Sequence, residues 1–330
     1  MAKLEVSSSA AACPSPPPEA AGSPARLVPS ILLIGERKCG TSSLARYLAL
    51  HSHVLPPNTK EPAYLTRNRA LSLDTYSRYF ALANATRSCM KWFELAASGR
   101  ITSEPVCKVV ADGCRATTFD ASAGYLSEAS PHAVFQLLPR ARALAVLRAP
   151  HLRALSHWRM HQRFKREGRS AYKSTTNFSL MIDAEQQRLA ARPCRVTTCR
   201  RAPYLAPGLL YEQNVARWMA HGPLMVLFTE ELDNATAHGP QRLAEYLQPA
   251  LRFFGLAPVS MTSLLNLQQP LRSNVASVVL SAVSGGVDEQ PAVLKATLNR
   301  LVSYFKGPNR ALAARLHRLH LPEEWSAPFA

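Results

Sequence analysis

Residues 31–50 read ILLIGERKCGTSSLARYLAL, and this stretch decides the fold. Its first four residues, 31–34, are an apolar run typical of a buried strand in a parallel sheet. A turn follows over residues 35–43, with two glycines, two adjacent cations and three hydroxyl side chains. Residues 44–50 then repeat apolar side chains at helical spacing. The sequence therefore predicts a strand, a loop and a helix in succession.

The loop has the composition of an anion site. Glycine lets backbone N–H groups approach an oxyanion, the helix N-terminus presents the positive end of its dipole, and a lysine with hydroxyls completes the contacts. In the nucleotide-binding pattern GxxxxGK[ST] the lysine follows the second glycine, whereas here Lys38 precedes Gly40 and no lysine follows it. This order weakens an ATPase interpretation, and a turn that binds no ligand stays open as an alternative.

A second unit of the same kind begins at residue 144. Residues 144–147 predict a short buried strand, and Arg148 follows at its carboxyl end. With Pro150 at its start, a helix is predicted from His151 to about Phe164. Ser156 lies about two helical turns beyond Arg148. Taken alone, an arginine at a strand end and a serine on a helix are commonly surface residues.

Composition excludes several classes of protein. The chain has 330 residues, 47% of them apolar and 18% charged, which is enough for one large or two small domains with a core. It contains no uncharged apolar run near the length of a membrane span. Its 39 Lys and Arg against 22 Asp and Glu give a net charge of +17, which favours nucleotides, nucleic acid or acidic glycans as partners. A generally basic surface is the alternative explanation.

The cysteines and the glycosylation sequons bear on the compartment. The seven cysteines match no zinc pattern, so we expect no metal. In an oxidising compartment Cys194 and Cys199 are close enough in sequence to close a short loop. Three sequons, at Asn84, Asn177 and Asn234, permit N-glycosylation in a secretory lumen.

Residues 1–29 are rich in Ala, Ser and Pro, with no apolar signal-peptide core and no membrane-spanning segment. We expect a disordered tail there and one domain over residues 30–330. A transit peptide, or an anchor lost from the N-terminus, stays open as an alternative.

Taken together, the two units resemble carbohydrate sulfotransferases, namely the heparan sulfate N- and 3-O-sulfotransferases and the chondroitin 6-O-sulfotransferase that acts on 4-sulfated N-acetylgalactosamine. Residues 37–43 (RKCGTSS) resemble their 5'-phosphosulfate loop, and residues 147–156 (LRAPHLRALS) resemble their 3'-phosphate motif. Residues 118–126 (TFDASAGYL) look like the family's TFEKSPAYF segment, and residues 58–64 (NTKEPAY) look like its KE segment. The resemblance covers residues 30–325.

The resemblance implies an α/β, P-loop-like sulfotransferase fold with a central parallel sheet flanked by helices. It implies transfer of a sulfuryl group from 3'-phosphoadenosine 5'-phosphosulfate to a hydroxyl or amine of a carbohydrate, with an anionic, glycosaminoglycan-like acceptor and no nucleic acid. Such catalysis depends on in-line positioning and on stabilising charge on the departing oxygen. By the same resemblance we expect the Golgi lumen or membrane.

Roles for individual residues follow from the matched motifs. Lys38 is expected to hydrogen-bond the bridging oxygen, and Arg148 and Ser156 to hold the 3'-phosphate, a group that ATP lacks. Glu61 matches the carboxylate that takes the acceptor proton, although an exposed loop glutamate is the alternative. The segment expected to hold the 5'-phosphate end comprises Arg37, Lys38, Cys39, Gly40, Thr41, Ser42 and Ser43.

The chain also departs from the family pattern. Ala121 stands where the family has a lysine near the acceptor, and Ala123 replaces a proline. The family's late cysteine-bracketed Lys-Gly-Arg loop has no counterpart between Phe254 and Val293, where residues 272–274 (RSN) are a reduced version. Charge on the acceptor side then has four candidate sources: Lys60, Arg67, Lys108 and Arg115.

Two histidines lie at i and i+4 on the second helix, His157 and His161. Without an HExxH pattern or a third ligand, we interpret them as part of a basic helix face with Arg153, Lys165 and Arg166, and not as a metal site.

Two other functions compete with sulfuryl transfer: a P-loop nucleotide kinase or NTPase, and a non-catalytic protein of the same fold that binds anionic glycans. An NTPase needs an aspartate for Mg²⁺ at the end of a buried strand. The strand at residue 144 instead ends in Arg148, and the strand at Val226 ends in Thr229 and Glu230.

Overall fold

The computed structural model describes most of the chain from residue 26 onward. The described residues are 26–51, 53–67, 71–81, 87–91, 94–95, 101–102, 105–109, 116–168, 177–194, 202–258 and 290–329.

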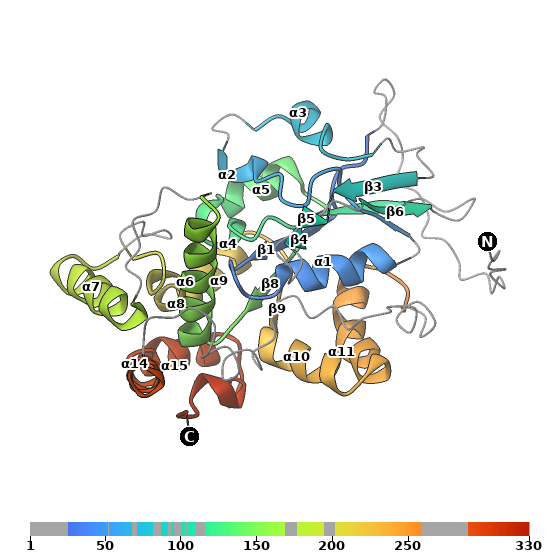
Figure 1. The fold of residues 1–330 in the computed structure, drawn as a ribbon. Coiled ribbons are helices and arrows are strands. Elements are labelled where there is room, and N and C mark those ends of the chain that lie inside the picture. The colour runs from blue at the N-terminus through green and yellow to red at the C-terminus, as the bar shows by residue number, and fades with distance from the viewer. Residues whose placement is uncertain are drawn as a thin grey trace.

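A five-stranded sheet lies at the centre of the molecule, and all its neighbouring strands are parallel (Figure 1). The expected α/β fold with a central parallel sheet is confirmed, and both strands that begin the phosphate motifs belong to this sheet. In spatial order the strands are β2 (Val54–Leu55), β7 (Thr117–Asp120), β1 (Ile31–Gly35), β8 (Arg142–Leu147) and β9 (Leu224–Phe228).

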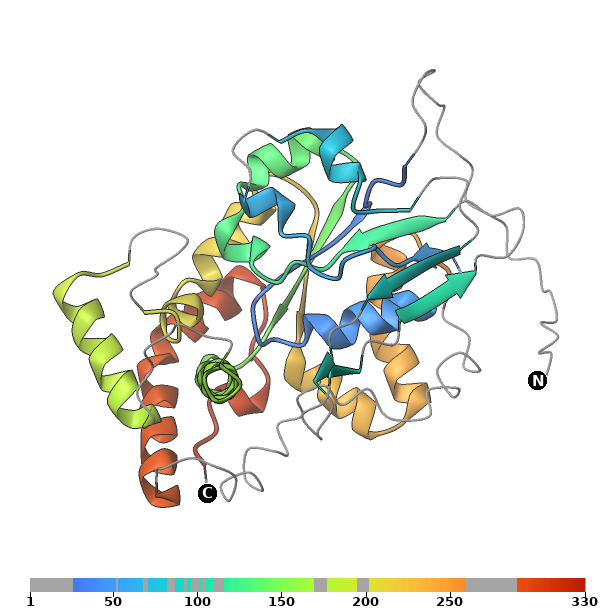
Figure 2. The same ribbon diagram turned by 45° about the horizontal axis from the view of Figure 1, so that its top comes forward.

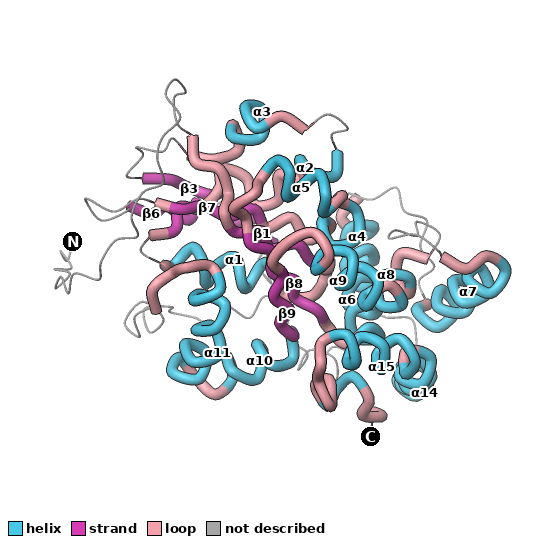
Figure 3. The backbone as a smooth tube through the Cα atoms, turned by 180° about the vertical axis from the view of Figure 1, so that it is seen from behind, coloured by secondary structure: helices cyan, strands magenta, loops and turns pink. Residues whose placement is uncertain are grey.

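Helices cover both faces of the sheet because side chains alternate along the central strands. On β1, Ile31 and Leu33 pack into one core cluster and Leu32 and Ile34 into another. The first cluster includes residues of α1 (Thr41–Leu50), α10 (Thr229–Ala237) and α11 (Pro240–Phe253). The second includes residues of α2 (Tyr64–Arg67), α3 (Leu73–Ser77), α4 (Tyr125–Glu128), α5 (Pro131–Leu137), α9 (Tyr211–Met219) and α15 (Lys306–Arg315). Figure 3 shows the strands running between these layers.

A third core cluster lies beside the sheet, around α6 (Pro150–Arg166), which Figure 2 shows end-on. Trp158 of α6 and Phe178 meet edge-to-face, with ring centroids 5.6 Å apart. The helices that share this core with α6 are α7 (Phe178–Ala191), α8 (Ala206–Leu209) and α14 (Pro291–Tyr304). The helix predicted from His151 to about Phe164 is thus confirmed, with slightly wider bounds.

Small elements complete the described chain. Two antiparallel pairs lie outside the main sheet: β3 (Arg87–Lys91) with β6 (Pro105–Val109), and β4 (Glu94–Leu95) with β5 (Ile101–Thr102). A 3₁₀ turn, η2 (Glu323–Trp325), places Trp325 in the core.

The predicted start of the domain and the predicted disulfide between Cys194 and Cys199 both lie at ends of described segments. Leu27 donates its backbone N–H to the Ala81 carbonyl at 2.8 Å and packs against the core, so the described chain is packed a few residues before Ser30. Cys194 is disulfide-bonded, while Cys199 lies outside the described residues, so their pairing stays a prediction. Within the described ranges, no helix has the length and apolar character needed to span a membrane.

Candidate active site

The loop between β1 and α1 ends in a glycine, which offers no side chain to cap α1. Gly40 precedes the helix with φ of 87°, a left-handed conformation that glycine adopts without strain. The first turn of α1 contains no acidic residue. The positive end of the helix dipole is therefore not balanced by a carboxylate of that turn, which favours binding of an anion.

Side chains from later in the chain hold this loop in place. The Thr229 hydroxyl lies 2.8 Å from the carbonyl oxygen of Cys39 and 3.0 Å from that of Leu147. Tyr211 donates its hydroxyl to the Arg148 carbonyl at 3.2 Å. The carboxyl ends of β1 and β8 are thus tied together through the start of α10 and the start of α9.

Cations gather where these two strands end. Burial, followed by the charges of Arg163, Arg148 and Lys60, lowers the pKa of Lys38 from 10.5 to about 8. Arg148 is only 4% exposed and, among the described residues, forms no ion pair. Like charges with little access to water destabilise one another, and a bound anion would reduce this repulsion. The structure therefore brings together Lys38 and Arg148, which sequence analysis assigned to opposite ends of one ligand.

The hydroxyl residues of the two motifs differ in their exposure. Thr41 is buried at the first position of α1, and Ser42 and Ser43 are partly exposed in the same turn. Ser156 is partly exposed on α6.

Arg37 has a carboxylate partner. Its guanidinium forms an ion pair with Glu128 of α4, and its side chain is 44% exposed. It passes over Gly124, where a Cβ atom would lie 2.6 Å from the Arg37 Nη2 atom. The structure thus places Arg37 against α4, unlike Lys38.

Cys39 is held within the loop by contacts to the rest of the protein. Its side chain is fully buried, and burial raises the pKa of its thiol to about 12. Its N–H donates to the Glu36 carbonyl at 3.1 Å, its carbonyl accepts from Thr229, and its Sγ lies 3.5 Å from the Tyr211 hydroxyl. Cys39 therefore shapes the loop.

Glu61 lies on the rim of the site. Its side chain is 45% exposed and forms an ion pair with Lys60. Lys60 is within electrostatic reach of Lys38, and Glu61 is within reach of Arg37. The segment that follows the first helix is thus placed beside the loop.

A buried network that the sequence did not reveal holds this segment. Asp120, at the end of β7, accepts from the Ser122 hydroxyl at 2.6 Å and from the hydroxyls of Tyr76 and Tyr125 at 2.7 Å each. Ser122 in turn accepts the backbone N–H of Ala63 at 2.9 Å. Burial raises the pKa of Asp120 to about 6, although these hydrogen bonds lower it.

The prediction of an exposed basic face on the second helix is wrong for three of its residues. Arg153, His157 and His161 are buried, because this side of α6 packs against the segment before α8. The Arg153 guanidinium donates to the Tyr204 carbonyl, and His161 Nδ1 lies 2.6 Å from the Tyr204 hydroxyl. Burial, followed by the charge of Arg153, lowers the pKa of His157 well below its ordinary value. Lys165 and Arg166 are exposed as predicted.

The remaining candidates lie outside what the structure describes. Of the four proposed acceptor-side cations only the Lys60 side chain is described, and residues 272–274 are not. In the described ranges, no group of three or more His, Cys, Asp or Glu side chains is placed to hold a metal ion.

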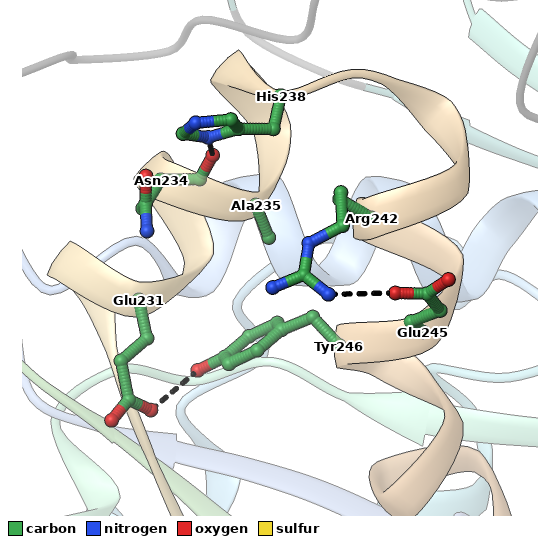
Figure 4. A pocket seen from close by; sticks show the side chains of 7 residues that line it. All are labelled: Glu231, Asn234, Ala235, His238, Arg242, Glu245 and Tyr246. Carbon is green, nitrogen blue, oxygen red and sulfur yellow. Dashed lines mark hydrogen bonds and ion pairs between the residues drawn. The ribbon is translucent and has the colours of Figure 1, made fainter.

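A separate pocket of about 450 Å³ lies between α10 and α11 (Figure 4). Its arginine, Arg242, donates to Glu245 at 2.9 Å, and its Tyr246 hydroxyl lies 3.4 Å from Glu231. The sequon residue Asn234 also lines it. Since the cation of this pocket is already paired with a carboxylate, the Lys38 cluster is the better anion site.

Comparison with solved structures identifies the fold. A sulfotransferase from Alicyclobacillus acidocaldarius superimposes with a TM-score of 0.54 over 88% of this chain and 96% of that one, at 21% identity. The chain therefore has a sulfotransferase fold.

Sequence comparison points to a particular group of relatives. The chain is 24% identical over 306 residues, 89% of its length, to bifunctional heparan sulfate N-deacetylase/N-sulfotransferase 3 of Mus musculus. It is 28% identical over 201 residues, 58% of its length, to the corresponding enzyme 1 of Xenopus laevis. The matches span 30% and 19% of these relatives. No protein-family model matches the chain. Fold and sequence together support the predicted resemblance to sulfotransferases.

Proposed function

We propose that this protein transfers a sulfuryl group from 3'-phosphoadenosine 5'-phosphosulfate to a hydroxyl or amine of a carbohydrate, with a glycosaminoglycan-like polysaccharide as acceptor. The observation that carries the proposal is the cluster of Lys38 and buried Arg148, at the carboxyl ends of β1 and β8, in a sulfotransferase fold. A donor with phosphates at both ends supplies the anions that this cluster requires.

The residues present fit such a donor. The N-terminal turn of α1, with Gly40, Thr41, Ser42 and Ser43, would hold the 5'-phosphate, and Arg148 with Ser156 would hold the 3'-phosphate.

Transfer requires one bond to break and one to form. The bond between sulfur and the bridging oxygen breaks, the acceptor oxygen or nitrogen bonds to sulfur, and adenosine 3',5'-bisphosphate leaves. Lys38 donates a hydrogen bond to the departing oxygen as its negative charge develops. Glu61 accepts the acceptor proton, a role that suits its exposed position beside the loop.

The two competing functions have less support. A kinase or NTPase requires an acidic Mg²⁺ ligand at a strand end. Glu230, after β9, accepts from the Ala149 N–H at 2.9 Å and the Trp325 indole at 3.0 Å, and Glu36, after β1, is buried and accepts from the Arg37 N–H at 2.9 Å. A non-catalytic glycan-binding protein would not need Glu61 beside the loop. By the same likeness to heparan sulfate enzymes we propose a Golgi location, in which the sequons at Asn177 and Asn234 would be available for glycosylation.

Thermal unfolding tests the donor. Adenosine 3',5'-bisphosphate at a hundred times its dissociation constant should stabilise the protein by about 2.7 kcal/mol, and Arg148→Ala should abolish the shift. ATP with Mg²⁺ should give no comparable shift. Stabilisation by ATP alone would instead support a kinase, and sulfate transfer from the labelled donor to desulfated heparan or chondroitin tests the acceptor.

A further inference from the structure

Two arginines of α6 lie on the same face of the helix as Ser156. Arg159 lies three residues beyond Ser156, and Arg163 seven, a spacing that places all three side chains along one side of the helix. Arg163 is also the charge with the largest effect on Lys38. This side of α6 therefore faces the cation cluster at the ends of the strands.

Arg159 is partly exposed, and one end of its guanidinium is buried. Its Nη2 atom is buried and, among the described residues, has no hydrogen-bond partner. Burial, followed by the charge of Arg148, lowers the pKa of its guanidinium, and no carboxylate opposes this effect. Two guanidinium groups thus lie within electrostatic reach of one another, and neither forms an ion pair in the described structure, an arrangement that costs free energy in the absence of a ligand.

A second group without a hydrogen-bond partner among the described residues, the His151 ring, lies within electrostatic reach of Arg148. His151 is fully buried, and in the described part of the chain neither of its ring nitrogens has a hydrogen-bond partner. Burial and the charge of Arg148 lower its pKa to about 3, so it is neutral. Buried polar groups near Arg148 therefore lack hydrogen-bond partners in the described structure, whereas most buried polar groups in native proteins have one.

Two carboxylates lie within electrostatic reach of Arg148, and neither forms an ion pair with it in the described structure. Glu230 is occupied by the Ala149 N–H and the Trp325 indole. Asp233 is within electrostatic reach of Arg148 but forms no ion pair with it in the described structure. A bound phosphate would therefore supply direct contacts to Arg148 that neither carboxylate makes.

We propose that Arg159 is a second guanidinium of the 3'-phosphate site and makes this protein select adenosine 3',5'-bisphosphates over adenosine 5'-phosphates. This inference depends on the proposed function. A phosphate dianion offers enough acceptor oxygens for two guanidinium groups as well as the Ser156 hydroxyl, and it would satisfy the buried Nη2 atom. Arg159 is in this sense a specificity-determining residue, additional to the matched motif of Arg148 and Ser156.

Calorimetric titration of Arg159→Gln tests the proposal, with Arg166→Gln as the matched control because Arg166 is exposed on the last turn of the same helix. Arg159→Gln should weaken the binding of adenosine 3',5'-bisphosphate by about tenfold to a hundredfold. It should change the affinity for adenosine 5'-monophosphate, which lacks the 3'-phosphate, by less than about threefold. Arg166→Gln should change neither affinity by more than that.

The unliganded protein gives a second readout. Because Arg159 is a partly buried cation within electrostatic reach of Arg148, Arg159→Gln should leave the melting temperature unchanged or raise it. A merely structural arginine would lower it.

The outcomes separate this inference from the proposed function. Equal weakening of both nucleotides would overturn the selectivity role, as would unchanged binding of the bisphosphate or a clear loss of stability. Failure of the wild-type protein to bind the bisphosphate at all would overturn the proposed function and this inference together. Normal bisphosphate binding that is lost in Arg148→Ala but not in Arg159→Gln would overturn this inference alone.

Discussion

The hydroxyl of Thr229, the first residue of α10, lies 2.8 Å from the carbonyl oxygen of Cys39. The two residues are 190 positions apart in the sequence. The same hydroxyl lies 3.0 Å from the Leu147 carbonyl, so one side chain joins the loops that follow β1 and β8. The distance between the two proposed phosphate sites therefore depends on a residue that belongs to neither motif.

Thr229→Val should both destabilise the protein and weaken donor binding. Valine keeps the shape but leaves two buried carbonyl groups without this donor, at a cost of about 1–3 kcal/mol. Denaturant unfolding measures the cost, and titration with adenosine 3',5'-bisphosphate measures the affinity. Thr229→Ser retains the hydroxyl and should behave much more like wild type; equal losses in the two variants would argue that only the methyl group matters.

Bisphosphate affinity should fall as the pH rises through about 8, where unliganded Lys38 loses its proton. Below that pH Lys38 is a cation that binds the phosphate. Above it Lys38 must take up a proton when the bisphosphate binds, so the affinity falls by at most about tenfold per pH unit. Titrations between pH 6.5 and 9.5 test this. Lys38→Arg keeps its charge over the whole range and should flatten the profile. A wild-type profile as flat as that of the variant would remove Lys38 from the phosphate contact.

Asp120 should make the protein less stable as the pH rises from about 4 to about 6. An unfolded aspartic acid ionises near pH 4, but buried Asp120 keeps its proton to about 6. The folded state therefore binds more protons in this window, and the free energy of unfolding falls with rising pH, by up to about 1.4 kcal/mol per unit. Above about pH 6 the contribution is constant.

The difference between wild type and Asp120→Asn isolates this effect, because Glu185 and Asp233 also have raised pKa values and titrate in both proteins. The variant should be less stable at neutral pH, since an amide offers one acceptor oxygen where the carboxylate accepts from three hydroxyls. Its stability should vary less between pH 4 and 6. Parallel stability profiles would mean that Asp120 titrates normally.

The parts of the fold that the sequence predicted are those with a local pattern. The apolar run before Gly35, the proline at the start of α6 and the spacing from Arg148 to Ser156 each lie within one short segment. The Asp120 network was not predictable because Tyr76 lies 44 residues from Asp120. His157 and His161 have the local pattern of an exposed basic face, and only the packing of Tyr204 against α6 buries them.

Glu61→Gln should lower turnover while leaving donor affinity nearly unchanged. Glu61 lies on the rim, 45% exposed and paired with Lys60, so its amide analogue fits without disturbing the core. Loss of a general base lowers the rate by about 10²–10⁴-fold. Rates with labelled donor and a glycosaminoglycan acceptor, together with bisphosphate titration, separate the two effects. Lys60→Gln serves as the control for loss of the ion pair, since it removes the partner of Glu61 but not the base. A comparable loss of turnover and donor affinity in Glu61→Gln would assign this residue to donor binding instead.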